Sequence, residues 1–175
     1  EPDRKSHDLS KLVQDAVMLQ RLGQPNADIT LTVPKVAVLA ELDDTMISQA
    51  MTNLIKNAGE AIDTLIEKGA PDGLAPQVAV TMTVVDDQAH ITISDNGIGL
   101  PEDRARLFEP YVTTRSEGTG LGLPIVKKII EEHGGTLQLE NAPVFEGQHH
   151  FGAMAVIKLP LAPTDIAAAN TKKEV

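Results

Sequence analysis

The strongest constraint on the fold is a long amphipathic segment followed by a pair of alternating runs. Residues 43–69 repeat apolar side chains at helical spacing, with an aspartate at either of the first two positions as a cap and Gly69 as a stop. Residues 77–97 alternate apolar and polar side chains on both sides of a break near residues 86–88, which is the pattern of a β-hairpin. A long helix beside antiparallel strands predicts a layered fold rather than the regular strand–helix alternation of a doubly wound parallel sheet.

The rest of the chain adds shorter helices and strands. Helices are expected over residues 8–22, 101–109 and 124–133, and strands over residues 27–34, 35–43, 136–143 and 151–161. We therefore expect an α/β fold of two layers, a sandwich in which helices pack on one face of a mixed, mostly antiparallel sheet. The last residues, 163–175, are expected to form a disordered tail.

The composition excludes several classes of protein. The chain has 175 residues, of which 42% are apolar, enough for one domain with a sizeable core. Because it has no cysteine, no disulfide or thiolate zinc site can form. Its net charge of −10 and the lack of a basic patch argue against binding to nucleic acid. Without a run of about 20 apolar residues, we expect no direct membrane contact and a cytoplasmic location.

A glycine-rich loop feeds directly into an apolar helix pattern. Residues 116–126 read SEGTGLGLPIV, with Gly118, Gly120 and Gly122 ahead of Pro124. The spacing is neither the dinucleotide motif nor a P-loop, so the stretch is either a flexible linker or a phosphate-binding loop. The second interpretation is favoured because bare N–H groups and the helix dipole meet at an anchored helix N-terminus.

A second glycine-containing stretch, DNGIGL at residues 95–100, follows a strand. An Asn-Gly pair is typical of a tight hairpin turn, but Pro101 and a helical segment come next instead of a returning strand. Asp95 shares one face of its strand with Ile91 and Ile93, so its carboxylate is directed toward the core. A buried carboxylate needs a hydrogen-bond donor, and the amino group of adenine is a suitable one.

The long helix carries polar side chains on one side. Asn53, Asn57 and Glu60 are spaced i, i+4 and i+7 and therefore lie on one helical face. The two amides either cap a neighbouring strand or supply oxygen to a hard cation such as Mg²⁺, which takes its other ligands from water and phosphates. Lys56 points away from this face and is expected to be solvated.

In their order along the chain, these stretches resemble the nucleotide-binding domain shared by sensor histidine kinases, type II topoisomerases, mismatch-repair ATPases and heat-shock chaperone ATPases, the Bergerat-type fold. The counterpart of the family's N box is NLIKNAGEA, that of its first glycine box is DNGIGL, that of its F box is LFEPYVTTR, and that of its second glycine box is GTGLGL. The resemblance covers roughly residues 25–160. From DNGIGL to the EEHGG turn, the sequence is most similar to sensor kinases of the nitrogen-regulation type, NtrY and NtrB.

The resemblance implies that ATP and Mg²⁺ are bound. Asn57 would hold Mg²⁺, and Asp95 would recognise the adenine amino group. Residues 101–122 would form a mobile lid anchored by Phe108, with Arg115 near the terminal phosphate. The residues implied in catalysis are Asn53, Asn57, Glu60 and Arg115, although Glu60 is equally compatible with simple solvation. Further nucleotide contacts are implied for Asn53, Gly97, Ile98, Gly99, Thr114, Gly118, Thr119, Gly120, Leu121 and Gly122.

One position separates a kinase from a hydrolase. In the family's ATPases a glutamate four residues before the metal-binding asparagine activates water, whereas this chain has Asn53 there. An amide does not accept a proton near neutral pH, so water lacks its general base. The terminal phosphoryl group would instead pass to the imidazole of a histidine. A non-catalytic nucleotide-binding module and an ATPase of this family are the alternatives.

The five histidines offer no convincing phosphoacceptor. His7 lacks the expected context, His133 ends a helix where a cation suits the dipole, and the pair His149 and His150 lies in a loop without a carboxylate pattern. The last strand carries GAMA, from residue 152, where the family often has a hydroxyl residue and a phenylalanine, so adenine recognition there would rely on water.

The chain therefore looks like the catalytic half of a sensor kinase. Residues 1–22 would be a connecting segment from an upstream dimerisation and phosphoacceptor domain, and residues 23–162 the ATP-binding domain. The expected partners are that helical domain and, through its phosphohistidine, a response regulator. The parent protein is expected to be anchored in the inner membrane.

Overall fold

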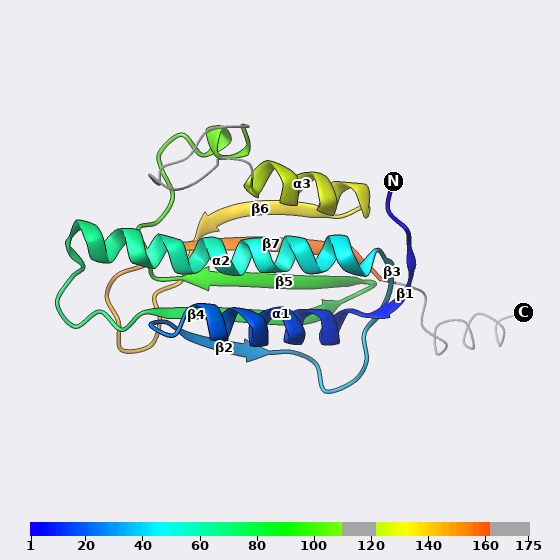
Figure 1. Ribbon diagram of the computed structural model, residues 1–175, viewed down its shortest axis with the longest axis horizontal. Helices are drawn as coiled ribbons and strands as arrows, with labels where there is room; N and C mark the ends of the chain where they lie inside the picture. Colours follow the sequence, from blue (N-terminus) through cyan, green and yellow to red (C-terminus); the bar gives the residue numbers. More distant parts are fainter. Residues whose placement is uncertain (110–121, 162–175) are drawn as a thin grey trace, which may run out of the picture.

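The computed structural model describes residues 1–109 and 122–161, and within them three α-helices lie on one face of a five-stranded sheet (Figure 1). The helices are α1 (Leu9–Gly23), α2 (Asp44–Gly69) and α3 (Gly122–Glu132), with a short 3₁₀ helix, η1 (Arg104–Phe108), before α3. The strands are β1 (Lys5–Asp8), β2 (Asp28–Thr32), β3 (Leu39–Leu42), β4 (Gln77–Val85), β5 (Gln88–Asp95), β6 (Thr136–Asn141) and β7 (Ala153–Pro160).

The main sheet has the strand order β2-β4-β5-β7-β6. β2 pairs with β4 in parallel, and each of the other neighbouring pairs is antiparallel. β4 and β5 form the predicted hairpin, with Asp86 at its tip in a left-handed conformation (φ 55°). The prediction of two layers, with helices on one face of a mixed and mostly antiparallel sheet, is confirmed.

The alternation of side chains along the strands decides which face of the sheet is buried. In β5, Ala89, Ile91 and Ile93 are at most 2% exposed, whereas the intervening residues are only partly buried. α2 packs over β4 and β5 at the centre of this face, α1 over β2, and α3 over β6 (Figure 1). The apolar side of each amphipathic helix therefore packs directly on the sheet, α2 on the inner strands β4 and β5 and α1 and α3 on strands nearer its edges.

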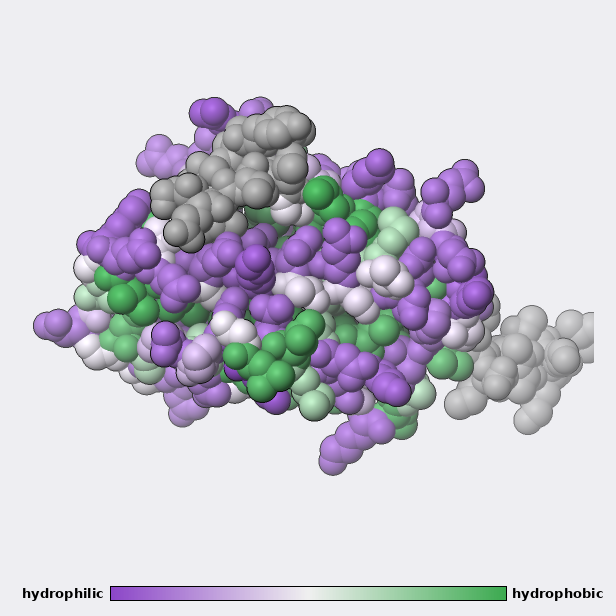
Figure 2. All heavy atoms as spheres, viewed as in Figure 1, coloured by the Kyte–Doolittle hydropathy of each residue, from purple (hydrophilic) through white to green (hydrophobic). Residues whose placement is uncertain are grey.

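The outer surface of the helix layer is mostly polar. Figure 2 shows hydrophilic side chains over much of this face, with apolar side chains near α1. Met18, Leu19 and Leu22, from the second half of α1, are all more than half exposed. Among the described residues, no helix is both long enough and apolar enough to cross a bilayer.

Residues 1–22, which we expect to be a connecting segment, contribute to the same core as the rest of the domain. β1, which the sequence patterns did not predict, pairs antiparallel with β3 in a separate two-stranded sheet. Leu9, Val13 and Val17 of α1 are completely buried in the common hydrophobic cluster. The packed core thus extends to the N-terminal side of residue 22, while a connection to a further domain stays a prediction.

His133 joins the end of α3 to the start of α2. Its Nε2 accepts a hydrogen bond from the backbone N–H of Asp43 (3.0 Å), and its Nδ1 lies 2.7 Å from the carbonyl oxygen of Ile129. Since an N–H group can only donate, Nε2 is unprotonated and Nδ1 carries the proton. This ring, only 4% exposed, therefore bridges the end of α3 and the start of α2, a role that the expectation of a cation suited to the helix dipole did not include.

Asp43 is the N-cap of α2 and is one of the two aspartates that the sequence offered as a cap. Its Oδ1 accepts from the N–H of Met46 (3.1 Å) and its Oδ2 from the N–H of Asp3 (2.9 Å). These bonds, that of Asp3 foremost, hold the pKa of the Asp43 carboxyl below its ordinary value.

We predict that Gly135→Ala destabilises the fold, because the turn that connects α3 to β6 packs closely against the last strand, β7. A Cβ at Gly135 would lie 2.3 Å from the carbonyl oxygen of Lys158 and 2.9 Å from Cδ2 of Leu159. The expected loss in the free energy of unfolding is about 1–3 kcal/mol, measured by urea denaturation. Gly23→Ala is the matched control, since a Cβ there meets no atom within 4 Å. Equal stability of the two variants would contradict the packing described here.

Candidate functional site

Three elements meet at the end of the sheet where β5 stops. The loop after β5 is tied to α2 by a hydrogen bond from the N–H of Ile98 to the carbonyl oxygen of Ala61 (3.0 Å). The side chain of Asn57, on the same helix, lies 3.8 Å from the position of a Cβ at Gly122, the first residue of α3. The predicted aspartate motif, the asparagine motif and Gly122, the described glycine of the second glycine motif, are therefore brought together by β5, α2 and α3 (Figure 1).

Asp95 is the last residue of β5 and is 4% exposed. Its Oδ1 accepts hydrogen bonds from the backbone N–H groups of Gly97 (2.8 Å) and Ala153 (3.3 Å). Burial raises the pKa of Asp95 to about 6, while these two bonds and the nearby ring of His150 act in the opposite direction. The prediction that this side chain follows its strand neighbours inward is confirmed.

Asn96 is buried beside it, and the sequence patterns assigned it no role. Its Oδ1 accepts from the N–H of Gln77 (2.9 Å), and its Nδ2 donates to the carbonyl oxygen of Ala75 (2.8 Å). The amide of Asn96 therefore links the start of β4 to the end of β5. An asparagine after a strand is a common turn signal, so no pattern in the sequence distinguished this role.

The loop from Gly97 to Gly99 is pressed against α2. A Cβ at Gly97 would lie 2.4 Å from the backbone carbon of Ala61, so only glycine fits there. Gly99 has a φ of +82°, a conformation that favours glycine. The loop continues to η1 and not to a returning strand, so the alternative of a tight hairpin turn is excluded.

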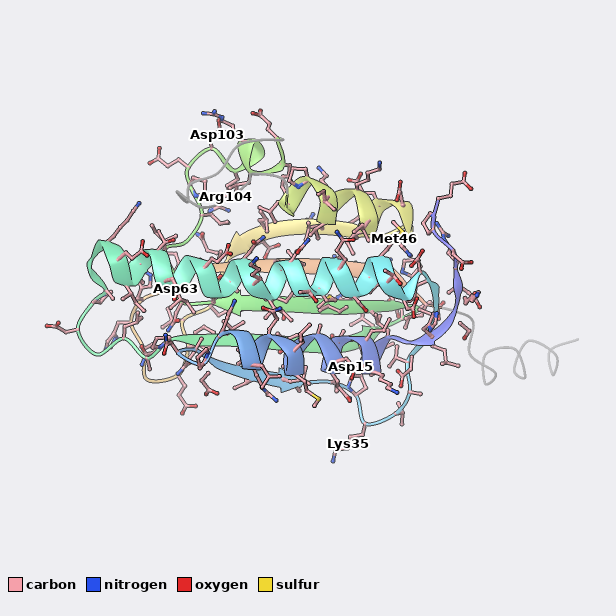
Figure 3. The ribbon with its side chains drawn as sticks, viewed as in Figure 1. Asp15, Lys35, Met46, Asp63, Asp103 and Arg104 are labelled. Atoms are coloured by element: carbon pink, nitrogen blue, oxygen red, sulfur yellow. The ribbon has the colours of Figure 1, made fainter. Side chains whose placement is uncertain are left out.

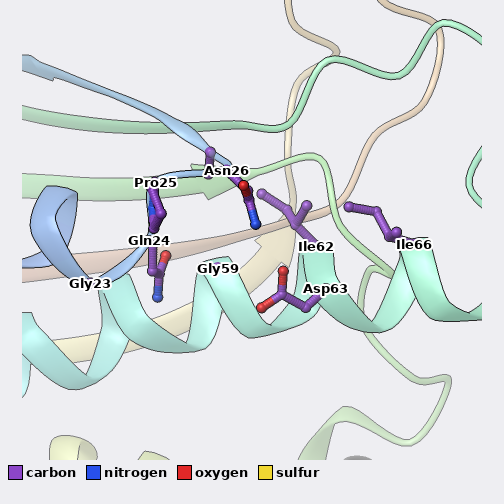
Figure 4. A pocket seen from close by; sticks show the side chains of 9 residues that line it. Gly23, Gln24, Pro25, Asn26, Gly59, Ile62, Asp63 and Ile66 are labelled. Carbon is purple, nitrogen blue, oxygen red and sulfur yellow. The ribbon is translucent and has the colours of Figure 1, made fainter.

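α2 presents different residues on its two sides. Asn53, Asn57 and Glu60 are half-buried on one face of the helix, and Lys56 is exposed, as expected. A small pocket lies on the opposite side of the helix, between α2 and the connection from α1 to β2 (Figure 4). Gln24 lies in this pocket, with its Nε2 donating to the carbonyl oxygen of Lys56 (3.3 Å). Since Gly59 faces Gln24, about half a turn from Asn57, this pocket is separate from the polar face.

Phe108 ends η1 and packs at the edge of the hydrophobic core. The Nζ of Lys127, from α3, lies 4.7 Å from the centre of its ring, a cation–π contact. Arg104 extends from the segment above α2 (Figure 3) and donates from Nη2 to Oδ1 of Asn141 (3.0 Å). Six of the predicted lid and nucleotide-contact residues lie outside the described residues: Thr114, Arg115, Gly118, Thr119, Gly120 and Leu121.

The sequence profile of one family, described as histidine kinase-, DNA gyrase B- and HSP90-like ATPase, matches residues 42–163. This match covers the long helix, the hairpin, the glycine loops and the last strand. The chain belongs to this family. Both the predicted resemblance and the fold that it implied are therefore confirmed, and the chain is the ATP-binding catalytic domain of a histidine kinase.

Similar proteins include sensor kinases of nitrogen regulation. The nitrogen regulation protein NtrY of Azorhizobium caulinodans is 46% identical over 143 residues, which are 81% of this chain and 18% of that protein. The sensory histidine kinase/phosphatase NtrB of Rhodobacter capsulatus is 36% identical over 137 residues, which are 71% of this chain and 34% of that protein. The chain thus spans only a minor part of the length of these relatives.

Solved structures show the same architecture. The catalytic domain of the histidine kinase ThkA matches with a TM-score of 0.73 and 26% identity, over 91% of this chain and 96% of that one. The mycobacterial sensor histidine kinase MprB matches with a TM-score of 0.75 over 92% of this chain and 99% of that one. At 24% identity, the second likeness shows the fold alone.

We predict that Asp95→Asn makes the domain more stable near neutral pH. Burial raises the pKa of Asp95 from about 3.8 to about 6, so the folded state holds this proton more tightly than the unfolded state does. The ionised carboxylate therefore lowers the free energy of unfolding as the pH rises through this range. The variant should gain up to about 3 kcal/mol at about pH 7.5, and the gain should vanish toward about pH 4.

Urea denaturation at both pH values measures this difference. Asp15→Asn is the control, because Asp15 is exposed on α1 (Figure 3) and the same change there should leave stability unaltered at both pH values. A gain at Asp95 that does not depend on pH would show that its carboxylate is not the source of the effect.

Proposed function

We propose that this domain binds Mg-ATP at the end of β5 and transfers the γ-phosphoryl group to a histidine on a separate helical domain. The observation that carries the proposal is Asp95, a buried acid held by Gly97 and Ala153 through one oxygen. Among the described residues, no hydrogen bond is made to its other oxygen, Oδ2. Adenine presents an amino group, which donates hydrogen bonds, so Oδ2 is suited to recognise it.

The polar face of α2 suits the phosphate end of the nucleotide. Asn57 lies beside the first residue of α3, where helix N–H groups attract an anion. Its amide oxygen is a ligand that Mg²⁺ accepts, and Mg²⁺ usually takes only one or two protein ligands beside phosphates and water. Among the described residues, no cluster of three or more His, Cys, Asp or Glu side chains is present to form an all-protein cage. The donors present therefore fit a cation that is bound together with the phosphates.

Asn53 supports transfer to a protein side chain over hydrolysis. It lies one helical turn before Asn57 on the same face of α2. A carboxylate there could take a proton from water, whereas an amide cannot. The remaining task of the site is then to position the phosphoryl group for a better nucleophile, such as an imidazole. Arg115, in the segment outside the described residues, is proposed to meet the terminal phosphate.

The partners follow from the same proposal. The relatives are much longer than this chain, so the proposed whole protein has room for the histidine-bearing helical domain, and the response regulator is the proposed partner of its phosphohistidine. The ATP-binding domain, expected at residues 23–162, shares its core with α1, so we propose that residues 1–22 belong to the same packed unit and also lead to the helical domain, with residues 163–175 as a tail. The domain would act in the cytoplasm, where ATP is available, even if the parent protein is anchored in the inner membrane.

The first test is nucleotide binding, measured by calorimetry with Mg-ATP. Asn57→Ala should weaken binding about tenfold or more, a change of about 1.4 kcal/mol, because it removes the proposed Mg²⁺ ligand. Asn26→Ala is the matched control, since Asn26 is exposed in the pocket on the opposite side of α2. If the two variants bind Mg-ATP equally, Asn57 is not at the nucleotide site.

The second test follows radiolabelled phosphate. With a histidine-bearing helical domain of the parent protein added, the domain should label that partner on an acid-labile phosphohistidine. Alone, it should hydrolyse ATP very slowly and should not label itself. Asn53→Glu should raise hydrolysis several-fold by supplying a base for water, whereas Asn26→Asp, the same kind of change away from the site, should not.

The outcomes separate the possible functions. Rapid hydrolysis by the unaltered domain, with no transfer to the helical domain, would place it among the ATPases of its family. Binding of ATP with neither hydrolysis nor transfer would instead identify a non-catalytic nucleotide-binding module.

A further inference from the structure

We propose that His150 is a positioning residue for adenine recognition, acting through the Gly97 loop; this rests on the proposed function. Its Nε2 lies 2.7 Å from the carbonyl oxygen of Gly97, although the two residues are 53 positions apart in the sequence. His150 belongs to the connection between β6 and β7, which the motifs of the family do not include.

The direction of this hydrogen bond is set by its acceptor. A carbonyl oxygen can only accept, so Nε2 of His150 carries a proton and donates it. The ring of His150 is stacked on that of Phe151, with 6.4 Å between the ring centres and 16° between the planes. The imidazole is half-buried, with its Nε2 directed at the loop that carries Gly97.

The bond completes the support of Gly97. On one side, its N–H donates to Oδ1 of Asp95 (2.8 Å). On another, the backbone of Ala61 in α2 leaves no room for a side chain, with only 2.4 Å to the position of a Cβ. His150 fixes the third side by binding the carbonyl oxygen. Without it, this carbonyl loses a bond that is independent of both β5 and α2.

The residues after His150 touch Asp95 directly. Ala153 donates its backbone N–H to Oδ1, and a Cβ at Gly152 would lie 2.3 Å from the same oxygen. The stretch from His150 to Ala153 therefore contacts both Asp95, through the N–H of Ala153, and Gly97, through the ring of His150. We infer that this stretch sets the direction of Oδ2, and with it the preference for a base that carries an amino group.

The test compares nucleotides with and without that amino group. ATP and inosine triphosphate share the same triphosphate, but hypoxanthine has a carbonyl in place of the amino group of adenine. Mg²⁺-dependent binding of each is measured by calorimetry for the unaltered chain and its variants. His150→Ala should weaken ATP binding roughly threefold to tenfold, the range for one neutral hydrogen bond, and should affect inosine triphosphate less.

Two variants make the result specific. His150→Gln places an amide N–H where Nε2 stood and should restore most of the affinity for ATP. His149→Ala removes the exposed neighbouring ring and should bind both nucleotides like the unaltered chain. Thermal unfolding without nucleotide reports any general loss of structure in each variant.

The proposal is overturned if His150→Ala keeps full affinity for ATP, if it weakens both nucleotides equally, or if His150→Gln is no better than His150→Ala. These outcomes differ from a failure of the proposed function, in which the unaltered chain itself would not bind ATP.

Discussion

The functional end of this domain depends on the burial of one carboxylate. Asp95 ends a central strand and is withdrawn from water, where an ionised acid is costly unless it is hydrogen-bonded. Two backbone N–H groups approach its Oδ1, and both approaches need a glycine nearby. Gly97 lies against the backbone of α2, and Gly152 lies so close to Asp95 that a Cβ would be 2.3 Å from Oδ1. The glycines on both sides of the site thus serve the packing of a single acid.

The long helix connects this site to the opposite end of the molecule. One side of α2 is buried against the sheet, and another carries Asn53 and Asn57 toward the start of α3. Its N-terminus is held by Asp43, whose carboxylate binds the N–H of Asp3 and whose own N–H is bound by His133 at the end of α3. α2 and α3 are therefore also fixed to each other at the N-terminus of α2, about four helical turns before Asn57, which lies beside the start of α3.

Much of the fold and part of the site could be predicted because their signals are local. The helical spacing of apolar residues in α2 and their alternation in β4 and β5 are visible in the sequence. Asn57 lies on the polar face of α2, and Asp95 on the buried face of β5, as this spacing predicts. β1 could not be predicted, because four polar-looking residues become a strand only when β3 lies beside them. The segment expected as a helix over 101–109 is a shorter 3₁₀ turn, Arg104–Phe108, whose Phe108 packs beside Lys127 of α3.

The sequence by itself determined the types of elements, the order of the nucleotide-binding motifs and the amide at position 53 that favours a kinase over a hydrolase. Only the tertiary structure decided the roles of the histidines. His133 bridges two helices because the N–H of Asp43, 90 positions away, donates to its Nε2. His150 is a donor because the carbonyl of Gly97 faces it. The proton position and partner of a histidine depend on which polar groups packing brings within hydrogen-bond distance, and such groups are distant in the sequence.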